Sequence, residues 1–128
     1  MVQFFRFSIV GTIGFVIDVA ILLALLEGSD LGYYWGRLLS FIAAATVTWA
    51  LNRSFTFERN PDAHRVSQWA RFIAVNSIGG VINYGIYSLF VTFSLLAQEW
   101  PILAVAAGSI AGLAFNFQAS RRLVFQQR

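Results

Sequence analysis

Four long stretches of mostly apolar residues constrain this chain more than any other feature of its sequence. They run over about 7–26, 34–51, 72–96 and 101–119. A helix that crosses roughly 30 Å of hydrocarbon needs about 20 apolar residues, so each stretch is long enough to span a membrane. Charged residues make up only 12% of the chain, about half the usual share in a soluble domain. We therefore predict an all-α integral membrane protein with four spans.

The arginines indicate how the spans are oriented. The chain has nine arginines and no lysine. Eight of them lie before the first span, around the central polar loop or after the fourth span, and Arg37 alone lies toward the opposite side. The two connections on that opposite side carry Glu27, Asp30 and Glu99. Because positive residues favour the inner face of a membrane, we expect a multi-pass protein of the cytoplasmic membrane with both termini cytoplasmic.

The first and third spans have similar sequences. RFSIVGTIGFVIDVAI (6–21) and RFIAVNSIGGVINYGI (71–86) are identical at eight of 16 positions. The second and fourth spans both carry small or short polar residues at every fourth position, and they end in NRSFTF (52–57) and SRRLVF (120–125). Small residues at this spacing let helices approach closely within a membrane. The sequence therefore indicates an internal duplication of a helix pair.

Because each repeat contains two helices, both repeats begin on the same side of the membrane. We predict a four-helix bundle built from two parallel two-helix repeats. The first repeat covers about residues 5–57 and the second about 70–125, with a cytoplasmic loop at about 58–68 between them. Residues 1–128 then form a single transmembrane domain.

Together, these features resemble the GtrA-like family of small four-span membrane proteins. The likeness rests on the NRSFTF motif (52–57), on Val124-Phe125 after the Arg121-Arg122 pair, and on the early pattern from Phe7 to Gly11. It covers almost the whole chain. One departure is Asn76, which stands where the first repeat has Gly11.

The resemblance implies a function in the handling of lipid-linked sugars. It implies translocation of a polyprenyl-phosphate-linked monosaccharide across the cytoplasmic membrane, for the synthesis or modification of cell-surface polysaccharide. It also leaves open a role as an accessory subunit of a membrane glycosyltransferase. The expected partners are the lipid-linked sugar, membrane lipids and such a glycosyltransferase. Four helices enclose little volume, so we also expect a homo-oligomer.

Four polar residues in the apolar spans are candidates for binding the headgroup or sugar. Asp18 lies near the middle of the first span, where a charged Asp costs about 2.5–3.5 kcal/mol, so it should face the interior. Asn83 is its equivalent in the third span, and Thr48 and Asn116 are equivalent to each other in the second and fourth. The alternative is that these residues bond one another and only fix the packing of the helices.

Four arginines are candidates for binding a phosphate. Arg53, Arg121 and Arg122 end the second and fourth spans, and a guanidinium can grip a phosphate with two parallel hydrogen bonds. The same residues could serve only to orient the protein among lipid phosphates. Arg37 could reach water, could pair with Asp18, Glu27 or Asp30, or could meet a phosphate at the outer side.

Several classes of function have no support in this sequence. There is no cysteine, and the single histidine, His64, lies in the polar loop without clustered partners. We therefore predict no metal, no cofactor and no catalytic residue, so the chain is not expected to be an enzyme. The arginines are spread among helix ends rather than gathered on one polar face, which argues against a nucleic-acid partner.

Two alternatives to a sugar-lipid translocator stay open. One is a proton-coupled efflux transporter of the small multidrug resistance type, which would use Asp18 as its carboxylate. The other is a purely structural anchor that holds a glycosyltransferase at the membrane.

Overall fold

The computed structural model describes residues 1–127, apart from the side chain of Tyr33, and that part of the chain contains no β-strand. The predicted all-α class is confirmed. The four long helices are α1 (Val2–Gly28), α2 (Gly32–Leu51), α3 (Arg65–Phe93) and α5 (Pro101–Ala119). A short helix, α4 (Leu95–Glu99), lies between α3 and α5. A π-helical segment follows α2 as η1 (Asn52–Thr56), and another follows α5 as η2 (Ser120–Val124).

Within the described residues, three helices are long and apolar enough to cross a membrane: α1, α3 and the helix that runs over Pro101–Val124. The second predicted span does form α2, with 20 residues, but it is not one of the three. Its residues include Arg37 and several Tyr, Trp and Thr side chains, which lower its mean hydropathy. The prediction of four spans is thus confirmed for three of them.

The third span ends earlier than the sequence suggested. The predicted span continued to Leu96, whereas α3 ends at Phe93 and Ser94 adopts an extended conformation. The side chain of Ser94 accepts a hydrogen bond from the backbone N–H of Ala97 at 3.3 Å. A serine in this position caps the N-terminus of a helix, so Ser94 starts the short helix α4. Pro101 then opens α5, as its fixed backbone angle favours.

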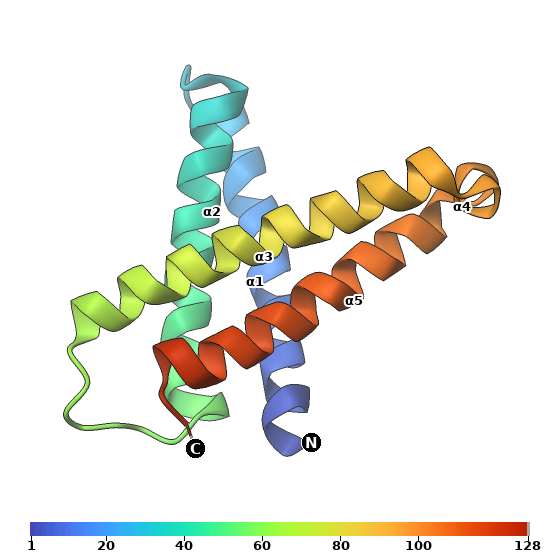
Figure 1. Ribbon diagram of the computed structural model, residues 1–128. Helices are drawn as coiled ribbons and strands as arrows, with labels where there is room; N and C mark the ends of the chain where they lie inside the picture. The colour runs from blue at the N-terminus through green and yellow to red at the C-terminus, as the bar shows by residue number, and fades with distance from the viewer. Residues whose placement is uncertain (128) are drawn as a thin grey trace.

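The helices form two hairpins that cross each other (Figure 1). In one hairpin α1 packs against α2, and in the other α3 packs against α5. The hairpins touch through α2 with α3 and through α1 with α5. Both termini and the loop 57–64 lie at one end of the molecule, which we call the terminal end (Figure 1). At the opposite, distal end the turn 29–31 and α4 lie well apart (Figure 1).

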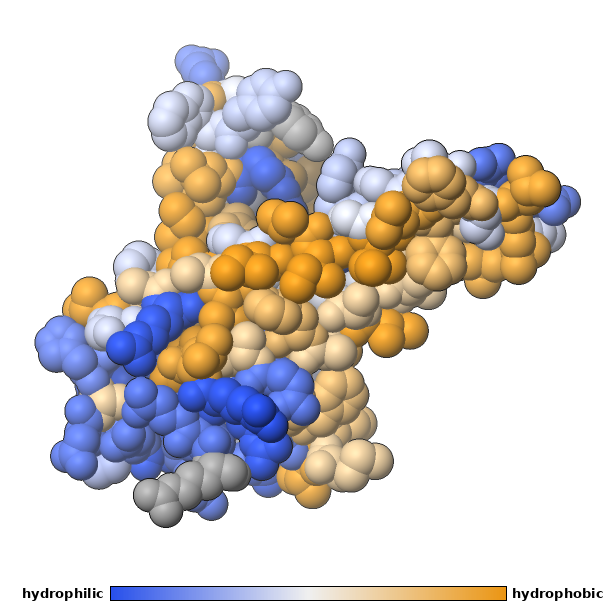
Figure 2. All heavy atoms as spheres, viewed as in Figure 1, coloured by the Kyte–Doolittle hydropathy of each residue, from blue (hydrophilic) through white to orange (hydrophobic). Residues whose placement is uncertain are grey.

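Hydrophilic residues gather over the terminal end, and hydrophobic residues cover much of α3 and α5 (Figure 2). Large apolar side chains are widely exposed along the helices, among them Phe15, Val81 and Ile110. A soluble monomer rarely exposes so much apolar surface. This distribution suits helices that are surrounded by lipid.

The two halves of the chain repeat several structural details. The π-helical segments end alike, because the backbone N–H of Phe57 donates to Asn52 at 3.0 Å and that of Phe125 donates to Ser120 at 2.8 Å. Phe57 and Phe125 are both buried. Positions that matched in the sequence also match in burial: Phe7 and Phe72, Val10 and Val75, and Gly14 and Gly79 are all buried.

A cluster of buried phenylalanines closes the terminal end. This phenylalanine cluster consists of Phe7, Phe57, Phe72, Phe117 and Phe125. The rings of Phe57 and Phe125 stack at 4.7 Å between centroids, and Phe7 meets Phe117 edge to face at 5.7 Å. Aromatic pairs in these geometries add to the stabilisation that burial alone provides. The cluster joins both hairpins, because its rings come from both halves of the chain.

Polar contacts also tie the hairpins together near the terminal end. The Oε1 atom of Gln68 on α3 accepts hydrogen bonds from the Trp49 indole at 3.1 Å and from the Arg53 guanidinium at 3.2 Å. The Trp69 indole donates to Thr46 Oγ1 at 2.9 Å. These bonds fix α2 against the first turns of α3.

We expect Phe72→Ala to lower the free energy of unfolding by about 3–5 kcal/mol, as truncation of a buried ring does, because Phe72 is 1% exposed. The measurement is thermal unfolding of the purified protein in mild detergent. Phe93→Ala is the control, since Phe93 lies on the same helix and is 81% exposed. A loss for Phe72→Ala no larger than that for Phe93→Ala would contradict the assigned core.

Candidate functional site

A cavity of about 610 Å³ lies between the two hairpins. All four long helices contribute to its wall, and ten of the described residues that line it are polar. The polar lining residues are Ser8, Thr12, Asp18, Arg37, Thr48, Asn52, Asn76, Asn83, Ser109 and Asn116. A polar space among largely apolar helices is the feature of this molecule that most suggests a ligand.

The structure brings the four predicted headgroup residues into this one cavity. Asp18 comes from α1, Thr48 from α2, Asn83 from α3 and Asn116 from α5. Among the described residues, none of the four is hydrogen-bonded to another of the four. The alternative reading, in which they bond one another to fix the packing, therefore has no hydrogen bond to support it. That they bind a ligand stays a prediction.

Asp18 forms an ion pair with Arg37. The Arg37 Nη1 atom donates to Asp18 Oδ2 at 2.6 Å. The Asp18 side chain is 13% exposed and the Arg37 side chain is 51% exposed. Of the partners considered from the sequence, Arg37 thus pairs with Asp18 rather than with Glu27 or Asp30. The pair lets an Asp and an Arg lie within the helices, because each charge offsets the other.

Asn116 is held in place by a close approach of two helices. A Cβ atom added at Gly79 would collide with the Asn116 amide, so the Asn116 side chain would have to move to make room for it. At the equivalent place in the first hairpin, a Cβ atom at Gly14 would collide with Thr48. Asn116 Oδ1 is buried and has no hydrogen-bond partner. Thr48, by contrast, donates its hydroxyl to the backbone oxygen of Ala45 at 3.0 Å.

Asn83 lies against the small residues of α5. Its side chain and backbone fill the space that Cβ atoms would need at Gly108 and Gly112. The small residues found at every fourth position of the fourth span therefore face α3. The sequence predicted close packing from this spacing, and the structure shows which helix it brings close.

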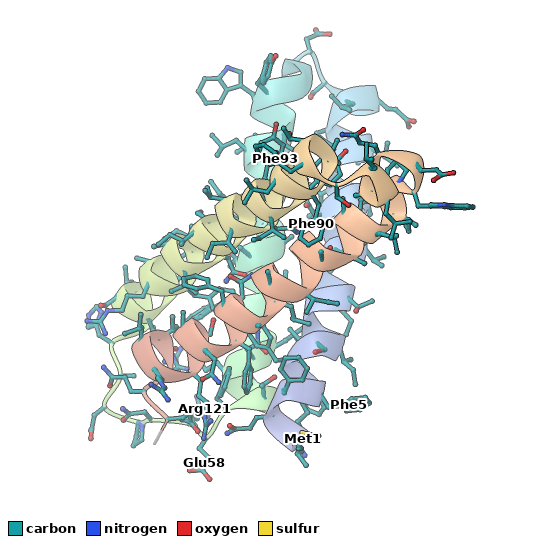
Figure 3. The ribbon with its side chains drawn as sticks, turned by 45° about the vertical axis from the view of Figure 1, so that its right-hand side comes forward. Met1, Phe5, Glu58, Phe90, Phe93 and Arg121 are labelled. Carbon is teal, nitrogen blue, oxygen red and sulfur yellow. The ribbon has the colours of Figure 1, made fainter. Side chains whose placement is uncertain are left out.

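The other predicted phosphate-binding residues, Arg53, Arg121 and Arg122, do not line the cavity. They belong to η1 and η2 at the terminal end, where Figure 3 places Arg121 near Glu58. The guanidinium of Arg53 donates to Gln68 and lies 5.8 Å from the Trp49 ring centroid. Partial burial, and then the nearby charges of Arg65 and Arg59, lower the pKa of Arg53. An arginine stays protonated under such conditions.

The phenylalanine cluster forms the floor of the cavity. Phe7 and Phe72 belong both to the cluster and to the cavity wall. The cluster therefore adjoins the cavity, whose wall at this end also includes Asn52 of η1, the residue before Arg53.

A family model described as the GtrA/DPMS transmembrane domain matches residues 6–125. The chain belongs to this family. The resemblance drawn from the sequence motifs is thereby confirmed. This GtrA/DPMS family member is a membrane protein, and its family handles polyprenyl-phosphate-linked sugars.

Sequence reasoning missed five polar residues of this GtrA/DPMS cavity, namely Ser8, Thr12, Asn52, Asn76 and Ser109. Asn52 is 2% exposed, and its Oδ1 atom accepts a hydrogen bond from the Thr56 hydroxyl at 2.7 Å. Its spacing of four from Thr48 places both residues on one helix face, which was the available signal. Asn76 donates to the backbone oxygen of Phe72 at 2.9 Å. In the sequence, Asn76 stands out only as a departure from the family pattern.

The described residues of this GtrA/DPMS family member do not gather metal ligands. Over residues 1–127, no three His, Asp or Glu side chains come together in a way that could hold a metal ion. The chemistry that the cavity offers is hydrogen bonding to hydroxyl groups, together with one guanidinium that could meet an anion.

We expect Gly79→Ala to lower the free energy of unfolding by about 1–3 kcal/mol, as overpacking does, because the added methyl group would meet Asn116. Gly80→Ala is the matched control, since its Cβ atom would meet open space and alanine favours a helix over glycine. Thermal unfolding of both variants in detergent measures the difference. Equal stabilities would show that α3 and α5 do not approach closely at Gly79.

Proposed function

We propose that this protein carries a polyprenyl-phosphate-linked monosaccharide across the cytoplasmic membrane, for the synthesis or modification of cell-surface polysaccharide. The observation that carries the proposal is the polar cavity, to which each long helix contributes at least one polar side chain. The family is generally one of flippases and accessory proteins rather than of catalysts, which supports a function without a chemical reaction.

The unpaired atoms of the cavity suit a sugar. Asp18 Oδ1 and Asn116 Oδ1 are buried acceptors without a hydrogen-bond partner. An unpaired buried acceptor costs about 1–3 kcal/mol. The hydroxyl groups of a sugar would supply the missing donors and recover that cost. Asn83 and Thr48 offer further polar atoms along the same wall.

The orientation that we propose places the terminal end in the cytoplasm. Arg53, Arg121 and Arg122 lie at that end together with both termini (Figure 1). Because positive residues favour the inner face of a membrane, their position supports this orientation. We also propose that α2 crosses the membrane with the other three helices. Its packing between α1 and α3 and the pairing of Arg37 with Asp18 support that placement.

We propose that the two hairpins arose as parallel repeats. The like ends of η1 and η2 and the matched burial of Phe7 with Phe72 support a duplication. Two related hairpins that meet around one cavity would provide two similar walls for a headgroup to pass between.

The arginines of the terminal end have a proposed place in this pathway. Arg53, Arg121 and Arg122 would meet the lipid phosphate at the cytoplasmic interface, before the headgroup enters the cavity. One chain encloses only a small cavity, so we propose that it works as a homo-oligomer or together with a membrane glycosyltransferase. In the second case the chain would act as the accessory subunit.

The two alternatives have weaker support. A proton-coupled efflux transporter would need an Asp18 carboxylate without a charged partner, whereas its Oδ2 atom is paired with Arg37. A purely structural anchor would not need buried acceptors that lack partners.

We expect Asn116→Leu to reduce transport of a prenyl-phosphate monosaccharide by about tenfold, which corresponds to the loss of one hydrogen bond to the ligand. Purified protein in liposomes would carry the lipid, and an impermeant sugar-oxidising enzyme would report the outward-facing fraction over time. Gln118→Leu is the matched control, because Gln118 lies on the same helix, is exposed and does not line the cavity. Transport that is absent from the wild type, or undiminished in Asn116→Leu, would contradict the proposal.

A further inference from the structure

We infer that Arg37 binds the phosphate of the ligand in the distal half of the cavity, and that Asp18 is the residue that positions the Arg37 guanidinium. The inference rests on the proposed function and adds to it the direction in which the headgroup lies. It also changes the role of Asp18 from a simple sugar ligand to a residue that acts partly through Arg37.

The first step concerns charge. Among the described residues that line the cavity, Asp18 and Arg37 alone are charged. The walls contributed by α3 and α5 offer only neutral polar groups such as Asn83, Ser109 and Asn116. An anion that enters the cavity therefore meets a single cation, and that cation is Arg37.

The second step concerns the depth of Arg37. Arg37 lies in the distal part of α2, which begins at Gly32. At 1.5 Å per residue, this places its backbone roughly 8 Å inside the helix. The ion pair with Asp18, which lies deeper in α1, turns the guanidinium toward the interior of the cavity. A phosphate that meets Arg37 therefore has to enter the distal half of the cavity.

The third step concerns the unused hydrogen-bond donors of Arg37. A guanidinium has five N–H donors, and the bond to Asp18 engages Nη1 alone. The Arg37 side chain is 51% exposed, so the rest of the fork is accessible. The bond from Nη1 to Asp18 holds the guanidinium in one orientation before the ligand arrives. This lowers the entropy cost of binding.

The fourth step concerns the second oxygen of Asp18. Its Oδ2 atom holds Arg37, while its Oδ1 atom is buried and has no partner. A hydroxyl group next to the phosphate, on the first carbons of the sugar, would lie within reach of Oδ1. Asp18 thus has one oxygen for Arg37 and one for the ligand.

The fifth step fixes the direction of the headgroup. Phe7 and Phe72 of the phenylalanine cluster, together with Asn52, line the terminal end of the cavity. Asn116 and Thr48 lie closer to that end than Arg37 does, because both are close to the terminal ends of their helices. A phosphate on Arg37 therefore directs the sugar toward Asn116 and leaves the lipid chain at the distal end.

The test compares two simple ligands. Farnesyl phosphate carries a phosphate without a sugar, and farnesol has neither. We expect Arg37→Gln to weaken farnesyl phosphate binding at least tenfold, and to leave farnesol binding unchanged, in protein held in neutral-lipid nanodiscs and measured by titration. Arg71→Gln is the matched control, because it makes the same charge change on an exposed arginine outside the cavity. An equal loss in both variants, or no loss in Arg37→Gln, would overturn the inference.

The role of Asp18 needs a double-mutant cycle. We expect Asp18→Asn to weaken farnesyl phosphate binding in the wild-type background, and to have no further effect in the Arg37→Gln background. Removal of both charges together also avoids leaving one buried and unpaired. An equal loss in both backgrounds would show that Asp18 does not act through Arg37 and would overturn its positioning role.

Failure of this inference is distinguishable from failure of the proposed function. If the wild type transports a prenyl-phosphate sugar in liposomes and Arg37→Gln binds farnesyl phosphate as well as the wild type does, the phosphate site is wrong and the transport function stands. If Arg37→Gln loses farnesyl phosphate specifically while the wild type transports no lipid-linked sugar, the phosphate site stands and the transport function falls.

Discussion

The cost of placing polar groups inside apolar helices determines how this molecule is arranged. Helices that lie in lipid have no water to satisfy Asp18, Asn83 or Asn116, so these groups have to face the space between the helices. Asp18 and Arg37 meet there as an ion pair at 2.6 Å, and glycines let the amide of Asn116 fit against α3. The phenylalanine cluster at the terminal end then joins the two hairpins around that space.

The sequence predicted those features that depend on the cost of burial and on helical spacing. Asp18 and Asn83 had to face the interior, and the small residues of the fourth span had to lie at a close helix contact. Other features depend on local geometry that spacing does not determine. The end of α3 at Phe93 depends on capping by Ser94. The choice of Asp18 as the partner of Arg37 depends on which side chains lie opposite each other once α1 and α2 have packed.

Residue spacing also does not determine which arginines face the cavity, and in the structure they divide into two groups. By type and position, Arg37, Arg53, Arg121 and Arg122 all suited a phosphate. Among the described arginines only Arg37 lines the cavity, whereas Arg53 is hydrogen-bonded to Gln68. Under the proposed function, this division would give a lipid-linked sugar a polar route with a cation toward each side. On the distal side one guanidinium is paired with Asp18, and on the terminal side Arg53, Arg121 and Arg122 lie outside the cavity.

The account depends most on a water-accessible cavity between the hairpins, and a thiol-labelling measurement tests this directly. The chain has no cysteine, so a single introduced thiol is the sole reactive group. Ser109 lines the cavity, and its neighbour Ile110 is 68% exposed on the outside of the same helix. In proteoliposomes, a membrane-impermeant maleimide should label Ser109→Cys rapidly and Ile110→Cys hardly at all, because lipid surrounds the outer face. Equal protection of both variants would contradict the account.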